Sequence, residues 1–227
     1  MAAILRRWRL TALVLFTLSS MACNPLALPY FLFLGPDPKV DPDFKLTSPD
    51  KHKPAKVVIL ASTPHMETRL ELSRADSELA ALFAQKLQEE CKKNKDNVVV
   101  ATSTKVQKFK DDHPNWRSLS LEELGKLLEA DYVIDLEIDQ LSLYEPGSQN
   151  TLFLGKAAIS VTVADVHKAE EGPAFQQQYR REYPRSGSLP VTDTNPQKFR
   201  RDFLTHVACD LTAMFTAFPS SNQHQCE

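Results

Sequence analysis

Apolar and polar positions in the chain after residue 55 follow the spacings of strands and helices. Residues 56–61 (KVVILA) form a continuous apolar run, which is typical of a strand that is covered on both faces. Residues 97–102 (NVVVAT) form a second run of this kind. Between the two runs, apolar side chains recur at helical spacing and predict a helix, whose stripe consists of Leu79, Leu82, Phe83, Leu87 and Cys91.

The second half of the domain predicts two helices with three strands between them. Ser120 and Glu123 form a capping box, so we expect a short helix that ends near Ala130. Strands are predicted where apolar and polar residues alternate, at 131–139, 152–166 and 175–183. Asn195-Pro196 starts the last helix, and Pro219 ends it. Its apolar stripe consists of Phe199, Phe203, Val207, Leu211, Met214, Phe215 and Phe218.

The order of these elements is βαβαβββα. It predicts an α/β (α+β) fold, with a single mixed sheet of about five strands and helices packed on it. The three consecutive strands are expected to form an antiparallel meander. We expect one domain over residues 56–218 and a polar tail at 219–227. The polar segment from Lys105 to Ser118 is assigned no element.

The amino terminus has the pattern of a secretory signal. Three arginines precede the apolar run LTALVLFTL, and a small-residue region ends at Cys23. The segment resembles a bacterial lipobox, with Ala22 before a Cys23 that becomes acylated, so residues 1–22 are predicted to be removed. Asn24 resembles the residue found in lipoproteins sorted to the outer membrane. An ordinary secreted protein and an uncleaved anchor remain the alternatives.

Residues 23–55 are predicted to be a lipid anchor followed by a tether. From Gly35 onward the segment is rich in proline and aspartate, which favours extended and semi-rigid backbone. The prediction places the protein in the bacterial cell envelope, bound on the periplasmic side through Cys23, at the outer rather than the inner membrane.

The composition excludes several classes of protein. Of the 227 residues, 42% are hydrophobic and 25% are charged, which is too apolar for a disordered chain and too polar for a multispanning membrane protein. A formal net charge of −2 argues against a nucleic acid partner, which normally requires a strongly basic face. P-loop, Rossmann, serine hydrolase and zinc protease motifs are absent. We therefore predict no enzyme activity and no cofactor.

Histidines and cysteines give no metal or redox motif. The 6 histidines include no i, i+4 pair, and His206 is expected at an edge or on the surface rather than as a ligand. No cysteine pair has CxxC spacing. Cys91 and Cys209 fall in predicted helices and are expected to be buried thiols, while Cys226 is able to pair with either.

An acidic row is the strongest candidate for a functional surface. Asp135, Glu137 and Asp139 alternate along one face of a predicted strand, and Arg180 lies on a strand that is expected to be near. Such a row is suited to a hard cation or to acid–base chemistry. It is also what the solvated face of a one-sided sheet shows, with cross-strand cations balancing it. A third interpretation is a surface that faces a partner.

The pattern resembles the TolB amino-terminal-like and CsgG-like domains of bacterial envelope lipoproteins. The resemblance rests on KVVILAST, NVVVATST, the EADYVIDLEID junction, the hairpin and the final helix. It implies a periplasmic binding or assembly module without catalytic residues. The sequence thus predicts a non-catalytic lipoprotein whose partner is another envelope protein, with a homo-oligomer as a further option. The alternatives are an auxiliary lipoprotein of an envelope transporter and a hydrolase that uses the acidic row.

Overall fold

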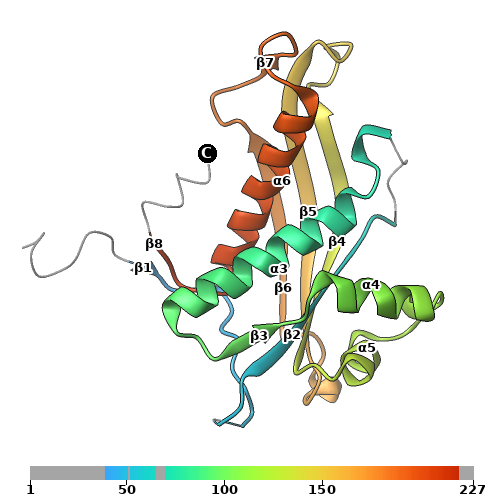
Figure 1. Ribbon diagram of the computed structural model, residues 1–227, viewed down its shortest axis with the longest axis vertical. Coiled ribbons are helices and arrows are strands. Elements are labelled where there is room, and N and C mark those ends of the chain that lie inside the picture. Colours follow the sequence, from blue (N-terminus) through green and yellow to red (C-terminus); the bar gives the residue numbers. More distant parts are fainter. Residues whose placement is uncertain (1–38, 51, 65–69, 220–227) are drawn as a thin grey trace, which may run out of the picture. The chain divides into compact units, whose positions relative to one another are not determined.

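The computed structural model describes residues 39–50, 52–64 and 70–219 (Figure 1). The predicted signal peptide, Cys23, Cys226 and residues 220–227 lie outside these ranges. The predictions made for them, and the predicted domain limits, stay predictions. The described residues from Val40 onward belong to one compact unit.

One mixed sheet of six strands organises this unit, and it confirms the predicted fold class. The strands lie in the spatial order β3-β2-β4-β5-β6, and the short β7 pairs with β5. β2 runs parallel to both β3 and β4, whereas β4, β5 and β6 form the expected antiparallel meander. A separate two-stranded sheet joins β1 to β8. The strand bounds are β1 Lys39–Val40, β2 Ala55–Ser62, β3 Val98–Val100, β4 Tyr132–Tyr144, β5 Leu152–Asp165, β6 Phe175–Tyr183, β7 Leu189–Pro190 and β8 Phe218–Pro219.

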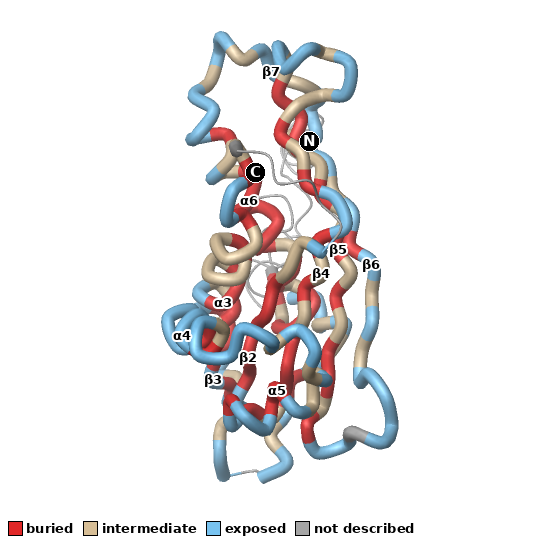
Figure 2. The backbone as a smooth tube through the Cα atoms, turned by 90° about the vertical axis from the view of Figure 1, so that its right-hand side faces the viewer, coloured by how far each residue is buried: buried red, intermediate tan, exposed pale blue. Residues whose placement is uncertain are grey.

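Helices pack on both faces of the sheet (Figures 1 and 2). α3 (Ala75–Asn94) and α6 (Pro196–Ala213) lie side by side over one face. α4 (Ser103–Asp112) and α5 (Leu121–Leu128) pack on the opposite face. Short 3-10 turns occur at η1 Leu70–Leu72, η2 Trp116–Ser118 and η3 Ala169–Glu171. Of the described helices, none is both long enough and apolar enough to cross a bilayer.

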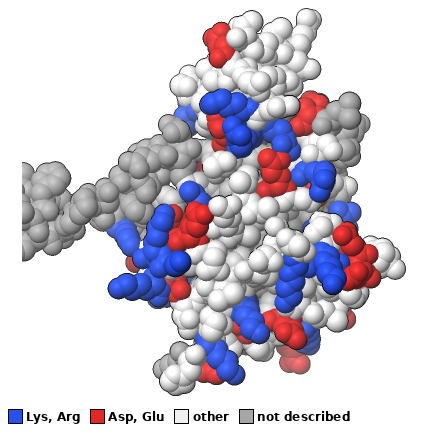
Figure 3. All heavy atoms as spheres, viewed as in Figure 1, with Lys and Arg blue, Asp and Glu red and all other residues white. Residues whose placement is uncertain are grey.

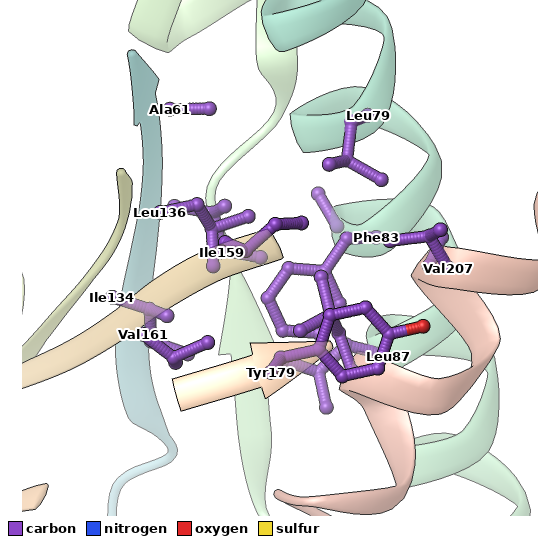
Figure 4. Close-up of a cluster of buried hydrophobic side chains, with 14 of the residues drawn as sticks. Ala61, Leu79, Phe83, Leu87, Ile134, Leu136, Ile159, Val161, Tyr179 and Val207 are labelled. Atoms are coloured by element: carbon purple, nitrogen blue, oxygen red, sulfur yellow. The ribbon is translucent and has the colours of Figure 1, made fainter. Parts of the chain in front are cut away.

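The main hydrophobic core lies between the sheet and the pair α3 and α6. Along β2, Ile59 faces this core, while the next residue, Leu60, faces a smaller core under α4 and α5. β2 is therefore covered on both faces, as its continuous apolar run predicts. Figure 4 shows how side chains of α3 and α6 meet those of the strands, among them Phe83, Leu87, Val207, Ile134, Leu136, Ile159 and Val161. The predicted apolar stripe of the last helix is buried, but the helix ends at Ala213 rather than at Pro219. Phe218 and Pro219 form β8 instead, where they pair with β1.

Helix α4 lies largely in the polar segment from Lys105 to Ser118, to which the sequence analysis assigned no element. Its signal is weak because only Val106 and Phe109 are buried, while the rest of the helix is polar. Thr102 supplies the start: its hydroxyl oxygen accepts a hydrogen bond from the Lys105 N–H at 3.4 Å. Apart from the short β1 and β8 at the two ends, the observed order is therefore βαβ, two helices, three strands, a short β7 and the final helix.

The described end of the predicted tether packs against the folded unit. Leu46 is buried, and Phe44 packs against the main core, with its ring 5.9 Å from that of Tyr132. The Phe44 N–H donates to the Met214 carbonyl at 2.9 Å, and the Tyr132 hydroxyl donates to the Thr47 carbonyl at 2.9 Å. Two apolar side chains among prolines and aspartates are enough to attach this stretch to the folded unit.

Candidate functional site

The predicted acidic row lies on the face of the meander that is turned away from the main core. Ile134, Leu136 and Ile138 point into that core, so the side chains between them, Asp135 and Glu137, point the other way. Pairing with β5 breaks between Ile138 and Gln140, which makes Asp139 the extra residue of a bulge. Figure 2 shows α3 and α6 on one side of β5 and β6 only. We call the opposite side of β4, β5 and β6 the outer face.

Polar side chains on the outer face form a ladder across the three strands. Gln178 of β6 donates through Nε2 to the Ser160 hydroxyl of β5 at 2.6 Å. That hydroxyl donates to Oδ2 of Asp139 on β4 at 2.8 Å. The ladder fixes neighbouring side chains in one arrangement, so the surface is ordered before any partner meets it.

Asp135 lies at the end of the acidic row nearest to the smaller core. Burial, together with the nearby charge of Glu137, raises the pKa of its carboxyl to about 6. Lys110 and Arg117 act in the opposite direction. The carboxyl thus titrates near neutral pH, unlike an ordinary aspartate on a solvated strand.

The expected balance by Arg180 is not observed. In the part of the chain that the structure describes, Arg180 forms no ion pair with Asp135, Glu137 or Asp139, and it lies opposite Ala158 in the register. Lys156 is the cation that pairs across strands, with Nζ 2.6 Å from Oε1 of Glu182. The bulge has moved Asp139 out of the simple alternation that places cross-strand partners.

A cleft of about 1020 Å³ opens where β2 and β3 end at their carboxyl termini. The chain leaves β2 toward α3 on one face of the sheet and leaves β3 toward α4 on the other. A crevice forms in α/β sheets where adjacent strands part in this way. One wall is unusually small in side-chain volume, because α3 contributes Ala80, Ala81 and Ala84.

The charges that line the cleft are mixed. Arg200 of α6 pairs with Glu78 of α3 and donates to the Ser73 carbonyl at 3.3 Å. Burial lowers the pKa of Lys110, and the positive charge of Arg117 lowers it as well. The negative charges of Asp76 and Asp135 raise this pKa but do not cancel the effect of burial. The lining cations are Arg74, Lys108, Lys110 and Arg200, and the lining carboxylates are Glu71, Glu78, Asp111 and Asp112. The cleft therefore favours neither an anion nor a cation by charge alone.

The acidic row and the cleft are separate places. None of Asp135, Glu137 and Asp139 lines the cleft, although Lys110 lies close to both. Among the described side chains, no cluster of three His, Cys, Asp or Glu is arranged to hold a metal ion. The outer face offers hydrogen-bonding and charged side chains, among them Asp139, Ser160 and Gln178.

The expectation for His206 is wrong, because its side chain is fully buried. Nη2 of Arg181 on β6 lies 2.8 Å from Nε2 of His206. Arg181 also lies 3.4 Å from Oδ2 of Asp210, which accepts a hydrogen bond from the Tyr179 hydroxyl at 2.8 Å. The helical pattern gives no warning of this, since the partners come from a strand that is 25 residues earlier in the chain.

The two described cysteines differ in state. Cys91 is a buried free thiol, as expected, and burial raises its pKa to about 11, which makes it a poor nucleophile. Cys209 is also buried and is disulfide-bonded, which is one of the states that the sequence left open for it.

The cleft and the buried polar network of α6 are the two features that the sequence analysis missed. The cleft had only part of a signal: the strand, helix and strand from β2 to β3 predict one crossover, but α4, which follows β3 on the other face, has a weak pattern of its own. The network had none, because it depends on tertiary pairing between β6 and α6.

Comparison with known proteins gives structural likenesses but no sequence family. No protein-family model matches the chain, and no curated protein is detectably similar in sequence. The lipoprotein GNA1162 from Neisseria meningitidis is 11% identical with a TM-score of 0.43, over 70% of this chain and 98% of that one. A protein of family DUF330 from Xanthomonas campestris is 12% identical with a TM-score of 0.42, over 78% and 87%. A PelC dodecamer from Paraburkholderia phytofirmans is 10% identical with a TM-score of 0.39, over 78% and 97%.

Proposed function

We propose that the chain is a lipoprotein of the bacterial cell envelope whose α/β unit is a non-catalytic binding and assembly module. The observation that carries this proposal is the amino-terminal pattern, in which arginines, an apolar run and Ala22 precede Cys23. Acyl chains on Cys23 hold the protein at the periplasmic side of the membrane without a basic patch. Asn24 supports sorting to the outer membrane.

The outer face is the proposed docking surface for another envelope protein. Asp135, Glu137 and Asp139 supply charge, while the ladder through Ser160 and Gln178 supplies ordered hydrogen-bonding groups. Arg180 is exposed at the β6 side of the same face. A polar surface of this kind gains specificity from complementary charge more than from apolar burial.

Two alternatives predict different outcomes for the same surface. An auxiliary lipoprotein of an envelope transporter docks on a permease or ATPase subunit. A hydrolase needs its carboxylates beside a substrate, yet the acidic row lies apart from the cleft. That separation supports the binding module over the hydrolase.

The anchor is tested by comparing Cys23→Ser with Ser19→Ala in the same segment. We expect the wild type and Ser19→Ala to sediment with membranes and to carry acylated Cys23 as the first residue in mass spectrometry. Cys23→Ser leaves the membrane fraction or keeps its unprocessed leader. An intact leader on the wild-type protein, or unchanged fractionation of Cys23→Ser, contradicts the proposal. Asn24→Asp tests sorting, because outer-membrane recovery should fall.

The docking surface is tested with a photo-crosslinking residue. Placed at Thr162 of β5, opposite Asp135 on the outer face, it should capture an envelope protein in intact cells. Placed at Leu127 on α5, which is 55% exposed, it should not. Capture of a permease or ATPase subunit selects the transporter alternative. Capture at Leu127 alone moves the docking surface away from the outer face.

A further inference from the structure

The two edges of the main sheet differ in how their backbone groups are satisfied. At one edge, β3 bonds to β2 through the Asn97 carbonyl and the Ala101 N–H. The intervening Val98 carbonyl and Val100 N–H therefore point away from the sheet. Gln88 of α3 reaches both of them: its Oε1 accepts from the Val100 N–H at 2.8 Å, and its Nε2 donates to the Val98 carbonyl at 3.3 Å. This carboxamide takes the place of a neighbouring strand.

The opposite edge, β6, carries no such cap. Its 9 residues pair with β5 in one unbroken register, from Gly155 opposite Tyr183 to Val163 opposite Phe175. In the described ranges, β5 is the only strand that pairs with it. Long and regular edge strands are templates for pairing with another chain. One edge of this sheet is thus closed and the other is open.

We propose that β6 is the docking edge for a second copy of this chain. The two β6 strands run antiparallel about a two-fold axis at Tyr179, so that the two main sheets join into one. With the axis there, all nine residues of each strand find a partner, which is the longest overlap that the strand allows. The interface is isologous and closes as a dimer.

The charges of β6 favour this register. An axis at Arg180 or at Arg181 sets that arginine directly opposite its own copy, which is unfavourable. The axis at Tyr179 instead sets the glutamines of the first half against the charges of the second half. Gln176 lies opposite Glu182 of the second copy, and Gln178 lies opposite its Arg180, on the outer face in both cases. No like charges stand directly opposite each other.

The core-side residues of β6 are also suited to this pairing. Phe175 lies opposite Tyr183 of the second copy, and Tyr179 meets its own equivalent, which gives aromatic cross-strand pairs. Arg181 lies opposite Gln177 and is already neutralised by Asp210 at 3.4 Å. The dimer would join two outer faces into one continuous docking surface.

The test uses four single substitutions at two exposed positions. Gln178→Glu and Gln176→Lys each create an attractive pair with the charge opposite, and they should tighten the dimer. Gln178→Lys and Gln176→Glu create repulsive pairs and should weaken it. Each dissociation constant should change about fivefold, because two symmetry-related pairs change at once. The variants serve as mutual controls, since an effect of net charge alone would give Lys the same sign at both positions.

The measurement is sedimentation equilibrium on the full-length chain in density-matched detergent, with circular dichroism to verify the fold of each variant. In the wild type, amide exchange over residues 176–182 should slow as concentration rises. A protein that stays monomeric throughout overturns the proposal. A dimer whose dissociation constant does not respond in opposite directions to Lys at Gln176 and Lys at Gln178 also overturns it. Protection of β6 only when another protein's extended segment is present also overturns it. The result does not depend on acylation, so this test and the Cys23 test fail separately.

Discussion

The imidazole of His206 accepts a hydrogen bond from the guanidinium of Arg181, with 2.8 Å between Nη2 and Nε2. A guanidinium has donors only, so Nε2 is the unprotonated nitrogen of this buried ring. The bond joins α6 to β6, and Asp210 and Tyr179 extend the same network between the two elements. His206, on the buried face of α6, therefore links this helix to the edge strand β6.

His206→Ala should destabilise the protein. It removes a fully buried ring and leaves the Arg181 donor without this acceptor, so we expect the free energy of unfolding to fall by about 2–4 kcal/mol. Urea denaturation measures it. The control is Thr205→Ala, at the exposed neighbouring position, which should change stability by less than about 0.5 kcal/mol. Equal losses in the two variants would contradict a role for the network.

Asp135→Asn should stabilise the protein at neutral pH. Burial, together with the charge of Glu137, raises the pKa of Asp135 to about 6. The folded state therefore holds this proton more tightly than the unfolded chain, so stability falls as the pH rises from about 4 through about 6. At pH 7.5 we expect Asp135→Asn to be more stable than the wild type by about 1–2 kcal/mol, and at pH 4 the two should be about equal.

Glu137→Gln provides the control for that pH dependence. Removing the neighbouring charge should lower the pKa of Asp135 and move the loss of stability to lower pH. Thermal unfolding across the pH range and NMR titration of the Asp135 carboxyl carbon both measure this. A titration of Asp135 that is the same with and without Glu137 would sink the account of the acidic row.

The sequence predicts those parts of the fold that local pattern determines. Within α6, the predicted stripe from Phe199 to Leu211 is buried because helical spacing selects the core face, whereas Phe218 is buried as part of β8. Helix α4 is not predicted by an apolar stripe, because Val106 and Phe109 are its only buried residues. The outer face follows from alternation along β4, but the bulge at Asp139 does not, because it is set by pairing with β5.

The residues whose surroundings the sequence did not predict contact partners that are distant in the chain. His206 is buried because Arg181 lies across from it, and Phe44 is held to the core by the Met214 carbonyl. Neither contact has a counterpart in local periodicity. The cleft likewise needs the crossovers of β2 and β3 to take opposite faces before Ala80 and Ala84 become its wall.

On the face that carries α3 and α6, basic and acidic side chains are mixed rather than gathered into patches of one sign (Figure 3). This agrees with the near-neutral formal charge of the chain.

Gly155→Ala should destabilise the junction between β5 and α6. A Cβ at position 155 would lie 2.7 Å from Cδ2 of Phe203, whose ring is fully buried. The ring has to move, so we expect a loss of about 1–3 kcal/mol in the free energy of unfolding. A double-mutant cycle with Phe203→Leu measures the conflict directly. The added methyl should cost less in the Phe203→Leu background, and an unchanged cost would show that the ring is not the obstacle.

Gln88→Met should open the closed edge of the sheet. The thioether matches the length of the glutamine side chain but offers neither the acceptor for the Val100 N–H nor the donor for the Val98 carbonyl. We expect a loss of about 1–3 kcal/mol in stability and faster amide exchange at Val100. Gln85→Met, at an exposed position on the same helix, should leave both measurements unchanged.

Gln88→Met also tests whether the β3 edge of the sheet, once it has lost its cap, associates with other chains as the β6 edge is proposed to do. If Gln88 prevents strand addition at β3, then Gln88→Met should convert a closed association through β6 into an open one, because each chain then offers two free edges. Sedimentation velocity should show species larger than a dimer that grow with concentration, whereas Gln85→Met should match the wild type. Loss of stability without larger species would mean that the carboxamide satisfies the β3 backbone but does not guard it against other strands.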